Sequence, residues 1–323
     1  MTRRLDASTG VLLILVASLC FGVCGPLAKS LIREGLTPLQ VTWLRVAGVC
    51  VAITITLTVG RRPTTRGRRR TPVRRLPWAG LIAYGLTAIA GVQACYFLAV
   101  SRLPVGIALL LEFTGPILVV AWIRVVRRTR LPRAAVVGAL LSLAGLAVVV
   151  QIWTGLRLDA LGLAAGAAAA ACQAAYYLGG ERLMADLDVR IMLAIGFAVG
   201  TVGLALPATP WDLDWGALLR PAALGDFSMP GLVVVLALIG CTAVAYATGL
   251  PALRRLSAPV AGAMGYAEVV VAAVAAWLLV GEEMTVPQIV GGVIVIAGVF
   301  TAQRAVAVGA GTTDEVGAVR TGR

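Results

Sequence analysis

Long apolar runs dominate this chain, and short polar or basic segments separate them. An α-helix rises about 1.5 Å per residue, so about 20 apolar residues cross the hydrocarbon core of a bilayer. The runs reach this length and predict membrane-spanning helices over approximately 10–32, 39–60, 78–100, 104–126, 134–153, 160–179, 191–208, 230–250, 259–280 and 286–302. We therefore expect an all-α membrane protein with ten transmembrane helices.

Composition supports this interpretation. Hydrophobic residues make up 59% of the 323 residues, charged residues only 13%, and the mean hydropathy is +0.93. The net charge of +13 raises the question of nucleic-acid binding. The basic residues, however, gather in short segments between apolar runs, and no aromatic residues are interleaved with them to stack on bases. We expect no nucleic-acid partner.

The distribution of cations predicts the orientation, because cytoplasmic loops carry an excess of Lys and Arg. Most cations lie in alternate connections, and the segment Arg61–Arg75 is the densest of these basic clusters. This pattern places both termini in the cytoplasm. It also places Arg61–Arg75 against anionic lipid head groups.

The two halves of the chain repeat. With a shift of 153 residues, Ser101-Arg102-Leu103 falls on Arg254-Arg255-Leu256, and Gly138 through Gly145 falls on Gly291 through Gly298. Five helices per half is an odd number, so the second half must be inverted, an arrangement that indicates alternating-access transport. The expected units are a first five-helix repeat at 8–153, a second at 158–304, and a disordered cytoplasmic tail at 305–323. Monomer and homodimer both stay open.

Two carboxylates lie near the middle of apolar runs. Glu112 is followed by Gly115 and Pro116, which predict a local helix break, and Glu268 lies ten residues into its own run. A charged group at this depth is costly, so each should face the bundle interior or pair with a cation. Desolvation favours the neutral acid, which makes both residues candidates for proton coupling, with Glu112 the better one. The alternative is that they only fix helix packing.

Two cations also lie within or near spans. Lys29, the only lysine, follows a possible helix break at Pro26 and either lines the binding site or reaches toward the outer interface. Arg45 lies in the outer half of its run. Its planar guanidinium suits bidentate binding of a carboxylate, either that of the substrate or that of Glu112.

Polar and aromatic residues within the spans extend the candidate substrate-binding site. Residues three or four apart share a helix face, as Gln173 does with Tyr176 and Tyr177. The same residue types also link helices in ordinary membrane bundles. The further candidates are Gln93, Tyr96, Thr114, Thr242 and Tyr246.

No catalytic constellation is present in the sequence. There is no histidine, no glycine-rich phosphate loop and no metal-ligand spacing, and the six cysteines all lie in apolar segments without a Cys-x-x-Cys motif. We expect no metal and no cofactor. The protein is therefore expected not to be an enzyme, with an intramembrane enzyme as the competing class.

Several of these segments resemble a known family. Thr37-Pro38 with Arg45, the string from Leu111 to Pro116, and Gly281-Glu282 are similar to patterns of the drug/metabolite transporter superfamily, EamA type. The string around Glu112 resembles the bacterial threonine/homoserine exporter branch, although Glu268-Val269 replaces the Glu-Pro typical of that branch. The resemblance covers about residues 8–304. It implies an inner-membrane exporter of amino acids or related metabolites, driven by the proton gradient.

The substrate class depends on the charges in the site. An exporter of amino acids is the main hypothesis, and an exporter of cationic drugs is the alternative, because two uncompensated acids would favour a cation. A pair between Arg45 and Glu112 would leave room for zwitterions, whereas separation of the two would favour cations.

Overall fold

The structure is a computed structural model that describes residues 2–59, 76–126, 128, 132–150, 158–253 and 267–321. Helices dominate the fold, and a single two-stranded hairpin occurs among these residues. The elements are α1 (Thr2–Arg33), α2 (Pro38–Val59), α3 (Trp78–Tyr84), η2 (Gly85–Gly91), α4 (Val92–Arg102), α5 (Val105–Glu112), α6 (Gly115–Val125), α7 (Arg133–Val150), α8 (Ala160–Asp186), α9 (Val189–Ala208), η4 (Pro210–Asp212), α10 (Trp215–Leu219), β1 (Pro221–Leu224), β2 (Phe227–Pro230), α11 (Gly231–Leu253), α13 (Ala267–Val280) and α14 (Val286–Thr321).

The helices are long and apolar enough for a membrane protein. Seven of the described segments meet the length and hydropathy of a membrane span, and three shorter apolar helices lie at Arg133–Val149, Ala267–Val280 and Val286–Ala302. These segments overlap the apolar runs expected from the sequence. One span, Trp78–Arg102, combines α3, the π-helical segment η2 and α4 in one continuous helix.

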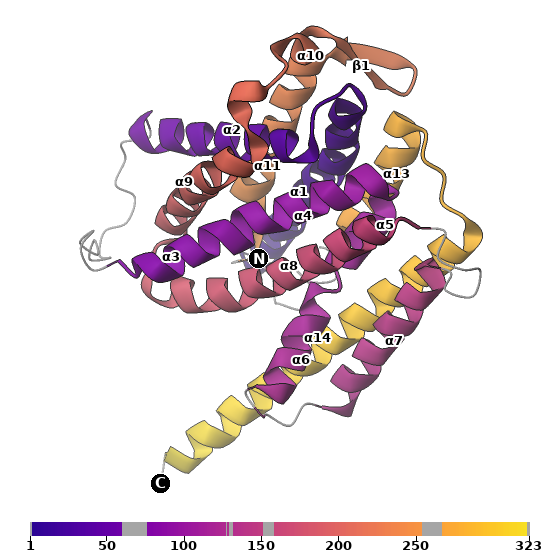
Figure 1. Ribbon diagram of the computed structural model, residues 1–323. Helices are drawn as coiled ribbons and strands as arrows, with labels where there is room; N and C mark the ends of the chain where they lie inside the picture. Colours follow the sequence, from indigo (N-terminus) through magenta and orange to yellow (C-terminus); the bar gives the residue numbers. More distant parts are fainter. Residues whose placement is uncertain are drawn as a thin grey trace.

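The central helix of the bundle is the short α5. All of its residues are buried, and it packs against α8, α13 and α4 (Figure 1). The larger core cluster surrounds it with apolar side chains from α1, α4, α11 and α13, and a second cluster joins α2, η2 and α9. A residue at the end of α5 is therefore held in the interior.

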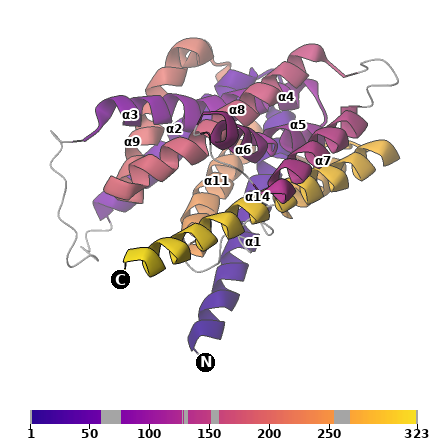
Figure 2. The same cartoon turned by 90° about the horizontal axis from the view of Figure 1, so that it is seen from below.

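Helices α7 and α14 lie side by side in both ribbon views and make the most extensive helix–helix contact among the described residues (Figures 1 and 2). A side chain on Gly138 would meet the Gly298 carbonyl at 2.6 Å, and one on Gly145 would meet the Gly291 carbonyl at 2.9 Å. Residue numbers rise along one helix as they fall along the other, so the two helices run antiparallel. These are the same glycines that match under the 153-residue shift.

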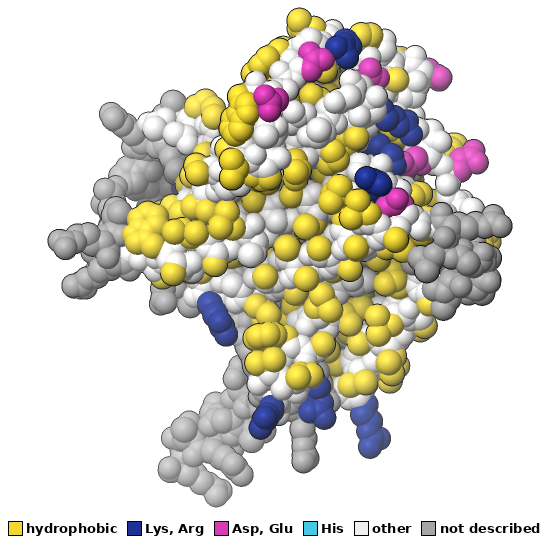
Figure 3. Space-filling model, in the orientation of Figure 1, with side chains coloured by type: hydrophobic (Ala, Val, Ile, Leu, Met, Phe, Trp, Pro, Cys, Tyr) yellow, Lys and Arg dark blue, Asp and Glu magenta, His cyan; other side chains and the backbone are white. Residues whose placement is uncertain are grey.

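The two ends of the molecule differ in charge. On the face in Figure 3, acidic and basic side chains both occur at the upper end, whereas the lower end carries basic side chains, with apolar surface between them. The described Arg124, Arg128 and Arg133 are exposed. This is the charge asymmetry expected of a protein that crosses a membrane.

The connection between α9 and α11 contains structure that the apolar pattern did not indicate. After η4 and α10, strands β1 and β2 form an antiparallel hairpin with Leu224 opposite Phe227. Gly225 takes a φ of 63° at the first turn position, as tight hairpins require, and its N–H donates to the Leu279 carbonyl at 2.8 Å. The turn thereby joins the end of α13.

Two expectations about helix ends are wrong. The segment expected to be a disordered tail is helical, because α14 continues to Thr321 and no proline after Pro287 stops it. The break expected at Pro26 is absent, since α1 runs through this residue. Figure 2 shows that α1 and α14 project from the bundle at their N- and C-terminal ends.

Candidate functional site

A buried arginine lies where α2 meets α11 and α4. Arg45 is 5% exposed, its Nε donates to Thr242 Oγ1 at 2.7 Å, and its guanidinium lies 5.1 Å from the centre of the Phe97 ring. Thr242 in turn donates to the Leu238 carbonyl at 2.7 Å. One edge of the guanidinium is thus fixed by a hydroxyl and one face by an aromatic ring, and no ion pair within 4.0 Å joins it to a described carboxylate.

The first carboxylate lies at a helix interruption. Glu112 is the last residue of α5 and is buried, and its Oε1 accepts a hydrogen bond from Gln173 Nε2 at 3.2 Å. Helix α6 begins at Gly115, with Pro116 in its first turn. The structure thus places the helix interruption directly after the carboxylate.

The second carboxylate comes from the other half of the chain. Glu268 lies in the first turn of α13 and is half-buried. Its charge interacts with that of Glu112, and the positive charge of Arg45 acts on both. The structure therefore brings these three candidates into one polar cluster, which we call the central cluster. Gly265, the repeat counterpart of Glu112, lies outside the described residues.

Tyrosines surround the central cluster. Tyr96 is 6% exposed and Tyr246 packs edge-on against Phe21 and Phe197, with ring centres 5.3 and 5.2 Å away. Both are within electrostatic range of Arg45 and of the two carboxylates.

The pair Tyr176 and Tyr177 lies on α8 beyond Gln173. The Tyr176 ring lies 5.7 Å from Tyr84 and 5.6 Å from Tyr177. Tyr177 is 43% exposed, yet the charges of both glutamates act on it. It is thus the most exposed of the tyrosines near the carboxylates.

Thr114 and Gln93 differ in their contacts. The Thr114 hydroxyl donates to the Leu111 carbonyl at 2.6 Å, so it supports the helix end after α5. Gln93 is buried, and neither its amide nitrogen nor its amide oxygen has a hydrogen-bond partner among the residues that the structure describes.

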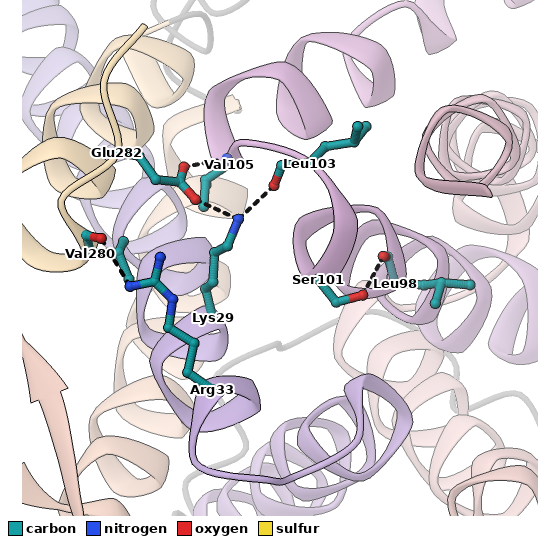
Figure 4. A network of polar contacts seen from close by, with 8 residues as sticks. All are labelled: Lys29, Arg33, Leu98, Ser101, Leu103, Val105, Val280 and Glu282. Carbon is teal, nitrogen blue, oxygen red and sulfur yellow. Dashed lines mark hydrogen bonds and ion pairs between the residues drawn. The ribbon is translucent and has the colours of Figure 1, made fainter. Parts of the chain in front are cut away.

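Lys29 lies apart from the central cluster, in a network at the end of the bundle (Figure 4). Its ammonium forms an ion pair with Glu282 Oε1 and donates to the Leu103 carbonyl at 2.7 Å. Glu282 Oε2 accepts from the Val105 N–H at 2.8 Å, and Arg33 donates to the Val280 carbonyl at 2.9 Å. We call these contacts the terminal network; they join α1 and the start of α5 to the end of α13.

Sequence reasoning did not assign a site role to some of these residues. Cys24 Sγ lies 3.6 Å from Thr242 Oγ1, and Phe97 covers Arg45. Cys24 and Phe97 are apolar residues within apolar runs, so the sequence did not distinguish them from ordinary packing residues. Glu282 was expected to lie in an acidic external connection and to belong to the family pattern, but no pairing with Lys29 was predicted.

Seven of the described helices are long and apolar enough to span a membrane, and a guanidinium and two carboxylates lie within the bundle. This combination is typical of membrane transporters. The EamA-like transporter family model matches residues 8–151 and 160–302, and the chain belongs to that family. The expected membership in the EamA-type drug/metabolite transporters is therefore confirmed.

Relatives of known name agree with the family. The threonine/homoserine exporter RhtA of Salmonella typhimurium strain SL1344 is 30% identical over 297 residues, covering 92% of each chain. RhtA of Escherichia coli K12 is 31% identical over 226 residues, covering 69% of this chain and 70% of that protein. The uncharacterized inner membrane transporter YicL of Salmonella typhimurium strain LT2 is 24% identical and covers 90% of this chain and 94% of that protein.

One solved crystal structure shares the fold. It superposes with a TM-score of 0.59 at 21% identity, covering 93% of this chain and 98% of that chain. The chain is thus a multi-pass membrane protein of a transporter family.

Proposed function

We propose that this protein exports small amino acids or related metabolites across the bacterial inner membrane in exchange for protons. The observation that carries the proposal is the central cluster, in which Arg45 and two carboxylates from both halves of the chain lie within electrostatic range of one another. The relatives named as threonine/homoserine exporters support the same substrate class.

Separation of Arg45 from Glu112, which the sequence led us to associate with cations, also suits a zwitterion, because the positive charge of Arg45 still acts on both glutamates. Arg45 keeps no carboxylate partner within ion-pair distance among the described residues, so its outer nitrogens are available to a substrate carboxylate. Glu112 and Glu268 lie in the same electrostatic environment and attract an ammonium group. The guanidinium and the two carboxylates act on one another electrostatically but form no ion pair in the described part of the chain, so they can bind the carboxylate and the ammonium group of an amino acid.

Proton exchange follows from the buried carboxylates. A substrate ammonium and a proton compete for the same negative charge, so a proton that enters from outside releases the substrate as it neutralises Glu112. The protonated site returns to the inside, loses its proton there and takes up the next substrate. Gln173 holds Glu112 in place during both steps.

The membrane arrangement belongs to this proposal. It comprises ten spans, two inverted repeats at 8–153 and 158–304, and both termini in the cytoplasm. The antiparallel contact of α7 with α14 at repeat-equivalent glycines supports the inversion. The proposal includes contact of the segment Arg61–Arg75 with anionic lipids, although this segment lies outside the described residues. Both a monomer and a homodimer are compatible with the proposed membrane arrangement.

Transport in proteoliposomes with an imposed pH gradient tests the proposal. Glu112→Gln keeps the shape and removes the exchangeable proton, so gradient-driven accumulation of threonine should be lost while passive exchange persists. Glu268→Gln should weaken coupling less. Glu283→Gln, in an exposed connection, is the matched control and should transport normally. Accumulation by Glu112→Gln at the wild-type rate would show that Glu112 does not couple transport to protons.

The second candidate is an exporter of cationic compounds. It is favoured by one observation, the lack of an ion pair between Arg45 and either glutamate, which leaves the two acids without direct compensation. Uptake of a quaternary ammonium compound in place of threonine, in the same vesicles, would select this alternative.

A further inference from the structure

The buried side chain of Gln93 on α4 has no hydrogen-bond partner. It is 6% exposed, and both Nε2 and Oε1 are unpaired within the described part of the chain. Buried polar groups are nearly always paired, since an unpaired one loses its water without compensation. An amide left open in this way is explained when a ligand completes its bonds.

The position of Gln93 associates it with the central cluster. Phe97, which covers the Arg45 guanidinium, follows Gln93 by four residues, and Tyr96 follows it by three, so the three share a helix face. The π-helical segment η2 ends at Gly91, two residues before Gln93. Such segments rotate the following side chains relative to a regular helix and often occur at functional sites.

The other buried glutamines of comparable exposure have structural roles. Gln40 Oε1 accepts from the Thr37 N–H at 3.0 Å, and Gln288 Oε1 accepts from the Thr285 N–H at 2.9 Å. Both lie at the start of a helix and satisfy its backbone. Gln93 lies near the beginning of α4, where the helix continues from η2, and has no such partner.

We propose that Gln93 recognises the side chain of the transported amino acid and selects substrates that carry a hydroxyl or amide group there. This inference rests on the proposed function. Arg45 binds the carboxylate, the glutamates attract the ammonium, and Gln93 supplies one donor and one acceptor to the third substituent. A hydroxyl both donates and accepts, so it satisfies both atoms of the amide. An aliphatic side chain of equal size leaves both atoms unpaired.

Threonine and valine provide the test, because they have the same shape and differ in the hydroxyl. Export of each is measured in proteoliposomes containing wild type, Gln93→Met or Gln40→Met, with protein-free vesicles to correct for leakage. Wild type should prefer threonine by about ten-fold or more, since a site built to bind a hydroxyl rejects the analogue that lacks it. Gln93→Met should lose this preference by accepting valine. Gln40→Met, the matched control, should keep it.

A second measurement requires no variant. Threonine should raise the melting temperature of the wild-type protein in detergent by more than valine does at the same concentration. Equal stabilisation, or equal export of both amino acids by wild type, would overturn the inference and leave the proposed function standing. Retention of the threonine preference by Gln93→Met would also overturn it. Failure of wild type to transport any amino acid would instead overturn the proposed function.

Discussion

The terminal network should stabilise the structure through the pair of Lys29 and Glu282. Their side chains are 14% and 12% exposed, so both charges are largely removed from water. Lys29→Met removes the ammonium from Glu282 and from the Leu103 carbonyl. Among the described residues, the Glu282 carboxylate then keeps the Val105 N–H as its donor, at 2.8 Å.

The magnitude follows from this partial burial. An exposed ion pair contributes about 0–1 kcal/mol, whereas removal of one partner from a fully buried pair costs about 3–5 kcal/mol. Lys29→Met should fall between these limits, at about 1–3 kcal/mol in the free energy of unfolding, because Glu282 keeps one donor. Glu282→Gln should cost less, since an amide oxygen can still accept from Val105.

The assay is a double-mutant cycle on the unfolding of the full chain in detergent. Lys29→Met, Glu282→Gln and their combination should give a coupling energy of about 1–2 kcal/mol. Arg102→Met is the matched control. This substitution breaks the ion pair between Arg102 and Asp159, whose charged atoms lie 3.4 Å apart. The two side chains are 46% and 38% exposed, so the free energy of unfolding should change by less than about 0.5 kcal/mol.

The same pair should also control access to the site. It joins α1 to the connection after α13, so the two halves cannot separate at this end while the pair persists. Lys29→Met should therefore increase labelling of a Ser101→Cys variant by a membrane-impermeant thiol reagent added outside. A coupling energy near zero together with unchanged labelling would refute both roles.

Three further predictions concern the site and the topology. Arg45→Lys should reduce transport at least about ten-fold at normal expression, because a lysine cannot bind a carboxylate with two parallel hydrogen bonds; wild-type flux would make Arg45 structural. Gly115→Ala should impair proton coupling, since the added carbon would lie 2.6 Å from Gln173 Oε1 and displace this partner of Glu112; unchanged coupling would show that Gln173 does not position the acid. Reporter fusions should read cytoplasmic at the C-terminus and external near Glu283, and a cytoplasmic signal at Glu283 would contradict the inverted topology.

Much of the helical framework was predictable from the sequence because burial in lipid requires long apolar runs. The hairpin at 221–230 was not, because a four-residue strand leaves little periodicity and only Leu224-Gly225-Asp226-Phe227 marks the turn. The long final helix was also missed. Its composition resembles a linker, but nothing in it stops a helix that has already formed.

The site was predictable in residue type more than in pairing. Interior charges stand out in an apolar chain, and Arg45, Glu112 and Glu268 were identified for that reason. Their partners depend on tertiary packing: Arg45 bonds to Thr242, 197 residues away, and Lys29 pairs with Glu282, 253 residues away. No local pattern connects positions so distant in sequence.

The two interior carboxylates are unequal because they lie at opposite ends of their helices. Glu112 is the last residue of α5, where the helix dipole opposes a negative charge, and Glu268 lies in the first turn of α13, where the dipole favours one. Of the two, only Glu112 has a side-chain amide, that of Gln173, as a hydrogen-bond partner among the described residues. Glu112 is therefore the better suited of the two to gain and lose a proton, because Gln173 can hold its carboxyl group in place in both states. This difference explains why Glu112→Gln should abolish coupling, whereas Glu268→Gln should weaken it less.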